Sequence, residues 1–374
     1  MTWQYLSPKQ TVFDKNSENN LSQRLNDLKV KKPLIVISKR LSCTSKASKL
    51  LEALKSVNIV ASLSNHVAPE APIELPAKIA EDFTNNDCDS IVAIGGGSVI
   101  DLAKAASILI SNGGDIENYL GINNVPNVTI PKIFISTTSG TGSEATNISV
   151  LGDIQNQSKK GIVSKYLFAD TVILDPTYTY SMPSNLKLNT GLDALCQCIE
   201  GITSKNASPI TNQFAYRGIE LIASNLAGSL ENDKTSMDNV YLGAYFSGLV
   251  ISGGNAGTNL GHAIGNTIGG IYHTAHGLSV TVVLEQIINH NKKSQEFINR
   301  IKDLEKSTGI NIFDFIQKFK NKYSIPSLSE IGVERKDFEY ISEKVMNDQQ
   351  RLLNNNLLSV TAEDIVGILK KSFQ

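Results

Sequence analysis

Three side chains in the second half of the sequence have the chemistry of a divalent metal site. Asp193 lies in a segment whose apolar spacing predicts a helix over residues 189–202. His262 lies in a second segment with helical spacing, and His276 follows fourteen positions later. One carboxylate and two imidazoles suit iron or zinc and leave a coordination position open for a substrate. By spacing alone, ordinary hydrogen-bonded histidines are the more common explanation of such residues.

Asp193 shares a face of its predicted helix with further polar side chains. The positions three, four and seven residues later hold Cys196, Gln197 and Glu200. Polar groups on the inner face of an apolar helix are costly to bury unless they are paired or bind a ligand. Gln197 is therefore a further candidate metal ligand, although a neutral amide oxygen is a weak one. Cys196 is either a soft ligand or, as its size favours, a packed small side chain.

A glycine-rich turn in the first half has the pattern of a phosphate-binding site. It directly follows a predicted strand over residues 90–94 and directly precedes a predicted helix over 99–109. Glycines let the backbone approach a diphosphate, and the helix N-terminus attracts its charge. We expect Ser98 to cap this helix, with Asp101 in a position like that of a capping box. A plain tight turn is the alternative, and the pattern is not the G-x-G-x-x-G of ordinary Rossmann dehydrogenases. The candidate cofactor contacts here are Gly95, Gly96, Gly97, Ser98 and Asp101.

A second polar, glycine-bearing turn follows the predicted strand 133–136 and extends to Glu144. Its hydroxyls and open backbone suit phosphate or ribose, although a solvated loop would have a similar composition. Two such turns at the carboxyl ends of strands in one sheet would form a nucleotide crevice. Lys159 or Lys160 could reach the cofactor from its edge, or both could be ordinary surface lysines. The candidate contacts are Thr137, Thr138, Thr141, Ser143 and Lys160.

The elements around these motifs predict an α/β N-terminal domain and an all-α C-terminal domain. Short apolar runs alternate with helical patterns in the first half, which is typical of an open parallel sheet. After about Pro183 the strand signals stop and long helical patterns follow. We therefore expect a dinucleotide-binding domain over 1–182 and a helical metal and substrate domain over 183–374, sharing a cleft. The expected strands are 33–38, 58–63, 90–94 and 133–136, and the expected helices include 45–57, 75–85, 185–203, 209–226, 236–252, 259–269 and much of 294–374.

Composition narrows the classes of partner. The chain has 374 residues and a net charge of −1, which gives no indication of binding to nucleic acid or to an anionic membrane. No apolar run approaches the roughly 20 residues that span a bilayer, and the N-terminal residues do not resemble a signal peptide. The four scattered cysteines are typical of reduced thiols. We expect a cytoplasmic protein that binds a small molecule and forms a homodimer.

Taken together, the motifs resemble the iron-containing (group III) alcohol dehydrogenase family. The resemblance covers nearly the whole chain and is strongest from about Cys88 to Leu284. It implies a dinucleotide-binding N-terminal domain, a helical C-terminal domain and a metal in the cleft between them. By this resemblance Asp193, His262 and His276 lie at ligand positions. The matching segments are Gly95–Lys104, Thr137–Glu144, Asp175-Pro176, Gly191–Leu195 and the two histidines.

Two positions depart from the family pattern. Members typically have a fourth ligand, a histidine, where this chain has Gln197, and many have another histidine where it has Asn266. Gln197 could coordinate weakly, or the site could have three protein ligands. Because Asn266 replaces that second histidine, His273 or a water remains as the candidate proton donor to the product oxygen. We therefore assign catalytic roles to His273 and, through the metal, to Asp193.

The resemblance implies a metal-dependent, NAD(P)H-linked alcohol dehydrogenase or aldehyde reductase. The metal would polarise the carbonyl group, and the nicotinamide would supply hydride. A non-redox lyase or cyclase like the related dehydroquinate synthases is one alternative, although the Gly191–Leu195 motif favours a dehydrogenase. A relative that has lost its metal and its activity is another.

Finer expectations concern the cofactor and the substrate. Members that select NAD usually have an acidic residue where this chain has Ser38, followed by Lys39 and Arg40, so we expect NADP to be preferred over NAD. The Gln197 context resembles the phosphonoacetaldehyde reductase branch, which produces 2-hydroxyethylphosphonate. Ordinary short-chain aldehydes or alcohols are the alternative substrates. Candidate partners for a phosphonate are Lys159, Lys160, Lys165 and His273.

Overall fold

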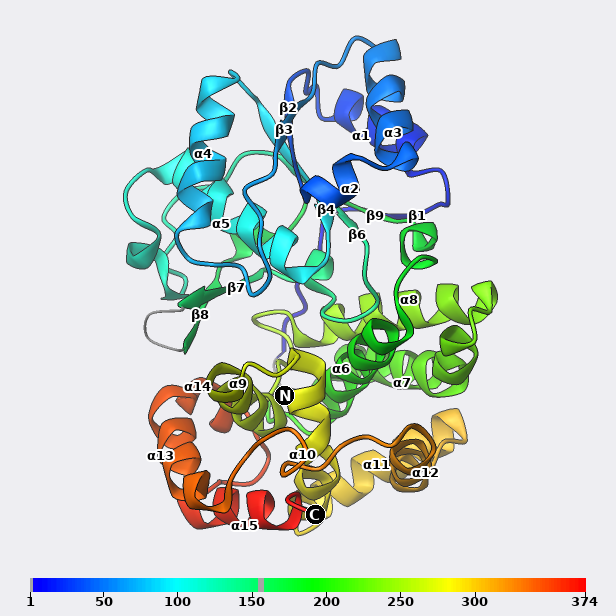
Figure 1. Ribbon diagram of the computed structural model, residues 1–374, viewed down its shortest axis with the longest axis vertical. Helices are drawn as coiled ribbons and strands as arrows, with labels where there is room; N and C mark the ends of the chain where they lie inside the picture. The colour runs from blue at the N-terminus through cyan, green and yellow to red at the C-terminus, as the bar shows by residue number, and fades with distance from the viewer. Residues whose placement is uncertain (1–2, 154–157) are drawn as a thin grey trace. The chain divides into compact units, whose positions relative to one another are not determined.

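The computed structural model describes residues 3–153 and 158–374, and Figure 1 follows the chain through them. The described chain divides into two compact units. Leu6–Met182 form one unit, and residues 3–5 pack with Pro183–Gln374 in the other. Among the described residues, no helix is both long enough and apolar enough to cross a membrane.

A six-stranded parallel sheet is the centre of the first unit. Its strand order is β1-β9-β6-β4-β2-β3, and every neighbouring pair runs parallel. The four inner strands are buried along their whole length, as a sheet covered on both faces requires. The predicted α/β class is confirmed. The strands are β1 (Thr11–Phe13), β2 (Pro33–Ile37), β3 (Ser62–Ser64), β4 (Ser90–Gly95), β6 (Lys132–Ser136) and β9 (Thr171–Leu174).

Helices cover both faces of this sheet (Figure 1). Helices α1 and α3 pack against each other and share a hydrophobic core with inner-strand side chains such as Ile35 and Ile133. Helices α4 and α5 pack against each other on the opposite face. The helices are α1 (Ser17–Asp27), α2 (Lys39–Ser42), α3 (Ser45–Ser56), α4 (Leu75–Asn85) and α5 (Gly97–Asn112).

A second, three-stranded sheet lies against α5. Strands β7 (Ile148–Asp153) and β8 (Ser158–Val163) are antiparallel, and the short β5 (Gly121–Ile122) pairs with β8. The sequence patterns did not indicate these strands. Because β8 contains Lys159 and Lys160, both candidate lysines lie on this small sheet.

One expected strand is misplaced. Residues 58–63 were expected to form a strand, but β3 begins only at Ser62. Asn58 follows the end of α3 with a left-handed φ of 60°, so the chain turns there. Val60 is 69% exposed, and its N–H donates to the Lys31 carbonyl at 2.9 Å. The apolar run therefore reflects a turn followed by a short edge strand.

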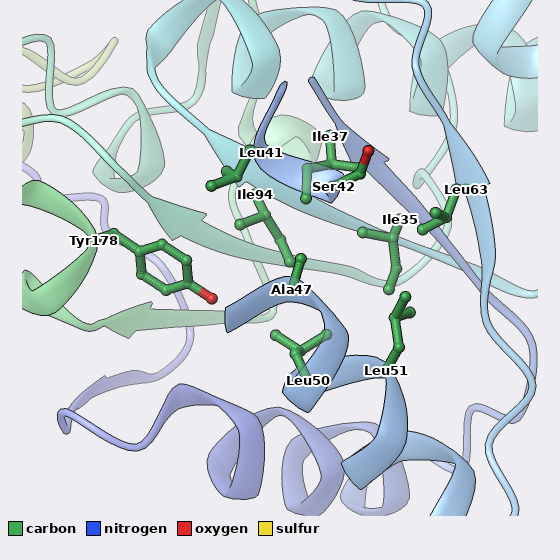
Figure 2. A pocket seen from close by; sticks show the side chains of 10 residues that line it. All are labelled: Ile35, Ile37, Leu41, Ser42, Ala47, Leu50, Leu51, Leu63, Ile94 and Tyr178. Atoms are coloured by element: carbon green, nitrogen blue, oxygen red, sulfur yellow. The ribbon is translucent and has the colours of Figure 1, made fainter. Parts of the chain in front are cut away.

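An apolar pocket lies between α3 and the sheet (Figure 2). Apart from the hydroxyls of Ser42 and Tyr178, its lining is hydrocarbon. It offers no cation or cluster of N–H groups for a phosphate, so it is a packing space of the core. The lining residues are Ile35, Ile37, Leu41, Ser42, Ala47, Leu50, Leu51, Leu63, Ile94 and Tyr178.

The second unit is helical, as predicted. One hydrophobic cluster joins α6 to α7, α8, α11 and α12, and another joins α9 to α13, α14 and α15. Helix α10 contributes to both clusters and packs against both α6 and α9. It therefore fixes the two helices that carry Asp193 and His262. The helices are α6 (Ser184–Ile202), α7 (Pro209–Leu230), α8 (Lys234–Ile251), α9 (Leu260–Tyr272), α10 (His276–Asn291), α11 (Gln295–Thr308), α12 (Ile312–Tyr323), α13 (Phe338–Asp348), α14 (Gln350–Leu353) and α15 (Ala362–Lys371).

Candidate functional site

Asp193, His262 and His276 come together in the helical unit. One potential ligand atom from each lies within 4.8 Å of the others. Asp193 Oδ1 is 3.4 Å from His262 Nε2 and 3.7 Å from His276 Nε2. Two ligands that bind one ion at about 2.1 Å in tetrahedral geometry lie roughly 3.4 Å apart. The three side chains are therefore spaced as ligands of a single ion.

The packing of α10 against α6 brings His276 to Asp193. His276 is the first residue of α10, and Gly277 follows it. A Cβ at Gly277 would overlap the Asn189 carbonyl oxygen and come within 3.1 Å of the Asp193 Cβ. Only glycine permits this close approach, and it places the His276 imidazole beside the carboxylate.

A buried carboxylate on α6 orients His262. Glu200, which is 1% exposed, accepts the backbone N–H of His262 at Oε1, 3.0 Å away. Its Oε2 contacts the ring Nδ1 of His262. A proton held on Nδ1 leaves the lone pair on Nε2, which faces Asp193. The sequence placed Glu200 on this helix face but gave it no role.

The charges around His262 also suit a cation. Burial lowers the pKa of His262, but the nearby carboxylates of Glu200 and Asp193 outweigh it and raise that pKa to about 10. Without a metal, the buried carboxylates are thus compensated by an imidazolium. Nε2 is fully buried and has no hydrogen-bond partner among the described residues. A divalent ion would replace the Nε2 proton and compensate the same carboxylates, so the donor set fits a metal.

The neighbouring polar residues on α6 differ in their surroundings. Gln197 Nε2 donates to Asp193 Oδ2 at 3.4 Å, and its Oε1 accepts from the Ser247 hydroxyl at 2.8 Å. Cys196 is fully buried, with its sulfur 3.9 Å from Thr281 Oγ1. Burial raises the pKa of Cys196 well above its usual value, so it is a neutral thiol here. Among the described residues, the cluster of potential ligand atoms comprises Asp193, His262 and His276 and does not include Cys196, so we interpret Cys196 as a packed side chain.

Asn266 lies on the same helix as His262, and His273 directly follows the end of that helix. His273 ends α9 in a left-handed conformation with a φ of 53°, and it is exposed three positions before His276. Asn266 lies one helical turn after His262 and is half-buried. The tyrosine before His273 anchors this helix end, because the Tyr272 hydroxyl donates to Asp337 at 2.7 Å. The proposed proton transfer from His273 stays a prediction.

The two glycine-bearing turns lie side by side at the carboxyl ends of β4 and β6. These strands are neighbours, with Gly95 paired to Ser136. The Thr137 N–H donates to the Gly95 carbonyl at 3.0 Å. A Cβ at Gly96 would come within 3.0 Å of Thr138, and one at Gly97 within 2.7 Å of Thr141. These glycines therefore allow the second turn to pack closely on the first. From the sequence, the glycines were explained only by the close approach of a diphosphate.

The expected helix cap is wrong. The N-cap of α5 is Gly96, with no side-chain cap, so Ser98 lies within the first turn of the helix. Asp101 is turned away from the helix start: it accepts from the Ser143 hydroxyl and from the Val150 N–H at 3.2 Å. The hydrogen bond between Asp101 and Ser143 therefore joins helix α5 to the second turn. Their contact with a dinucleotide stays a prediction.

Lys104, which sequence reasoning missed as a functional candidate, ties this region together. It is fully buried on α5, and its ammonium donates to the Ser143 and Ile148 carbonyls, both at 2.7 Å, and to Thr146 Oγ1 at 2.9 Å. Burial lowers the pKa of Lys104 to about 8, while the nearby Asp101 and Glu144 raise it. A lysine flanked on both sides by apolar residues, from Leu102 to Ala106, was the available signal.

The remaining cationic candidates have different environments. The Ser38 hydroxyl caps α2 by accepting the Leu41 N–H at 3.3 Å, and Lys39 and Arg40 after it are exposed. In contrast, two of the lysines proposed for an anionic substrate are paired. Lys159 lies 2.8 Å from Glu70, and Lys160 lies 3.5 Å from Asp153. Lys165 is exposed, with its ammonium 5.2 Å from the Tyr166 ring centre.

Comparisons with known proteins cover nearly the whole chain. The family model described as iron-containing alcohol dehydrogenase matches residues 8–176, and the C-terminal model of the Fe-containing alcohol dehydrogenase family matches residues 187–373. A sulfoacetaldehyde reductase of Bilophila wadsworthia is 31% identical, with all of both chains covered. An NAD-dependent methanol dehydrogenase of Bacillus methanolicus is 27% identical, covering 98% of this chain and 99% of its own. The crystal structure of a 1,3-propanediol oxidoreductase matches with a TM-score of 0.93 at 28% identity over all of both chains.

Proposed function

The chain belongs to the iron-containing alcohol dehydrogenase family and is an oxidoreductase, and from this premise we propose that it reduces small aldehydes with NAD(P)H. We further propose that a divalent metal, iron or zinc, is held by Asp193, His262 and His276. The observation that carries this proposal is the His262 Nε2 atom. It is buried, lacks a hydrogen-bond partner among the described residues and lies 3.4 Å from Asp193 Oδ1. Such an atom is costly to bury unless it binds something.

The reaction transfers a hydride from the nicotinamide to the carbonyl carbon and a proton to the carbonyl oxygen, which gives the alcohol and NAD(P)⁺. A metal bound here supplies a Lewis acid for the carbonyl oxygen. Glu200 holds His262 in the tautomer that a ligand requires. His273, exposed at the end of α9, is our candidate donor of the proton.

The first unit supplies the dinucleotide site in this proposal, so that residues 1–182 bind the cofactor and 183–374 hold the metal and the substrate. Support comes from the adjoining turns after β4 and β6, whose half-buried hydroxyls include Thr137, Thr138 and Thr141. We propose that NADP is preferred over NAD. Lys39 and Arg40 are exposed beside Ser38, where they can pair with a 2′-phosphate.

A second candidate is narrower: a two-carbon aldehyde that carries an anionic sulfonate or phosphonate. The sulfoacetaldehyde reductase that is 31% identical over the whole chain favours this class, which also includes phosphonoacetaldehyde. Two of the lysines expected to bind the anionic group are already paired, Lys159 with Glu70 and Lys160 with Asp153. This pairing weakens the case for them as partners of the substrate. His273 and Lys165 are the exposed candidates that remain.

Assembly and location complete the proposal. We propose a homodimer, which light scattering of the purified chain would test.

We propose a cytoplasmic location because all four cysteines are free thiols, as reducing compartments maintain them.

The test is steady-state oxidation of NADH and NADPH against an aldehyde panel. The panel contains sulfoacetaldehyde, phosphonoacetaldehyde, propanal, butanal and lactaldehyde. Turnover of any of these by the metal-loaded protein, with loss after chelation, supports the general proposal. Higher kcat/KM for the two anionic aldehydes supports the narrower one, whereas equal or higher kcat/KM for the plain aldehydes excludes it. If the metal-bound protein oxidises neither NADH nor NADPH with any of these aldehydes, the proposed aldehyde reduction is rejected.

A further inference from the structure

Gln197 lies where its side chain can act on the metal site in either of two ways. It is one helical turn after Asp193 on α6 and is 3% exposed. As a ligand, it would direct its amide oxygen at the ion. As a positioning residue, it would direct its amide nitrogen at a ligand and hold that ligand in place.

The hydrogen bonds favour the second arrangement. Asp193 presents a carboxylate, which accepts hydrogen bonds and cannot donate them. The amide group 3.4 Å from Asp193 Oδ2 is therefore the NH₂ of Gln197, as the structure has it. The amide oxygen then faces away from Asp193, toward the fully buried Ser247 on α8, whose hydroxyl lies 2.8 Å away. The Asp193 carboxylate thus fixes which end of the amide faces it, and the Ser247 hydroxyl, which also lies 2.7 Å from the Ala244 carbonyl, contacts the other end.

We propose that Gln197 is not a metal ligand but a positioning residue, anchored by Ser247, that holds the Asp193 carboxylate toward the ion. The inference rests on the proposed metal site. Asp193, His262 and His276 are then the whole protein ligand set, and the ion keeps the open positions that catalytic sites need. Helix α8 contributes to the site through Ser247 without touching the ion.

The experiment compares Gln197→Leu with Ser247→Ala. Leucine keeps most of the volume and removes the amide, while alanine removes only the anchor. Zinc affinity is measured by competition with a chromophoric chelator, and the ligand set is followed by the visible absorption of the cobalt-loaded protein. We expect both variants to bind zinc roughly tenfold more weakly. We also expect both to keep the wild-type cobalt spectrum, because no ligand is lost.

A control and a third variant complete the design. Ser229→Ala removes another buried helix hydroxyl, which donates to the Leu226 carbonyl at 2.9 Å, and should leave zinc affinity unchanged. Gln197→His should bind zinc more tightly than the wild type and change the cobalt spectrum, since it adds an imidazole at this position. A changed cobalt spectrum in Gln197→Leu, with wild-type zinc affinity in Ser247→Ala, would show that Gln197 is a ligand and overturn the inference. Wild-type protein that binds neither metal would instead reject the metal site itself.

Discussion

Glu200 holds His262 through both of its carboxylate oxygens. Oε1 accepts the backbone N–H at 3.0 Å, and Oε2 contacts the ring Nδ1. The two residues are 62 positions apart in sequence, on α6 and at the start of α9. The carboxylate therefore fixes both the backbone and the ring of the histidine, and with them the direction of Nε2.

Glu200→Gln should weaken metal binding about tenfold or more, in the range found for outer partners of metal-binding histidines. An amide can accept only through its oxygen, so one of the two contacts to His262 is lost. The measurement is zinc affinity by chelator competition. Glu343→Gln, an exposed change on α13, is the control. Equal zinc affinity in the wild type and in both variants would show that Glu200 does not orient the ligand.

The order of strands and helices was readable from the sequence where the elements are long and buried. The runs at β2, β4 and β6 are continuous and apolar, and the structure confirms all three. The β7–β8 hairpin was missed because β8 includes Lys159 and Lys160 and lies outside the main sheet. The prediction of a strand over 58–63 was wrong, because an apolar pattern does not reveal the left-handed turn at Asn58.

The site was predictable in part for similar reasons. The family resemblance is confirmed, and the structure brings together Asp193, His262 and His276. Contacts between distant helices were not predictable, and these include Glu200 with His262 and Ser247 with Gln197. Both depend on how α8 and α9 pack against α6, which no local spacing encodes.

The buried Glu144 predicts a pH-dependent stability. Burial raises the pKa of Glu144 to about 7, from an ordinary value of 4.5. Its contribution to stability is therefore full below pH 4.5, declines as the pH rises and is lost by about pH 7. Glu144→Gln does not titrate. The variant should raise the free energy of unfolding relative to the wild type more at about pH 8 than at about pH 5, by up to roughly 3 kcal/mol, as measured by urea unfolding at the two pH values. A pH-independent difference would show that Glu144 stays ionised in the fold.

Ser38→Asp should shift cofactor preference toward NADH. Aspartate can still cap α2 by accepting the Leu41 N–H, so the local fold is kept. Its charge repels a 2′-phosphate and its oxygens accept the ribose hydroxyls. The ratio of kcat/KM for NADPH to that for NADH should fall at least tenfold, while Ser48→Asp, exposed on α3, should leave it unchanged. A wild-type enzyme that is already tenfold more efficient with NADH would contradict the proposed preference.

The central claim is that one divalent ion binds to Asp193, His262 and His276, and elemental analysis of His276→Ala tests it most directly. His276 lies 3.7 Å from Asp193 Oδ1 and its side chain is 26% exposed, so alanine removes a ligand with little loss of packing. Wild-type protein should carry one iron or zinc ion per chain, and the variant should lose both the ion and aldehyde reduction while keeping its thermal stability in the metal-free form. A variant that keeps full metal occupancy would contradict the claim.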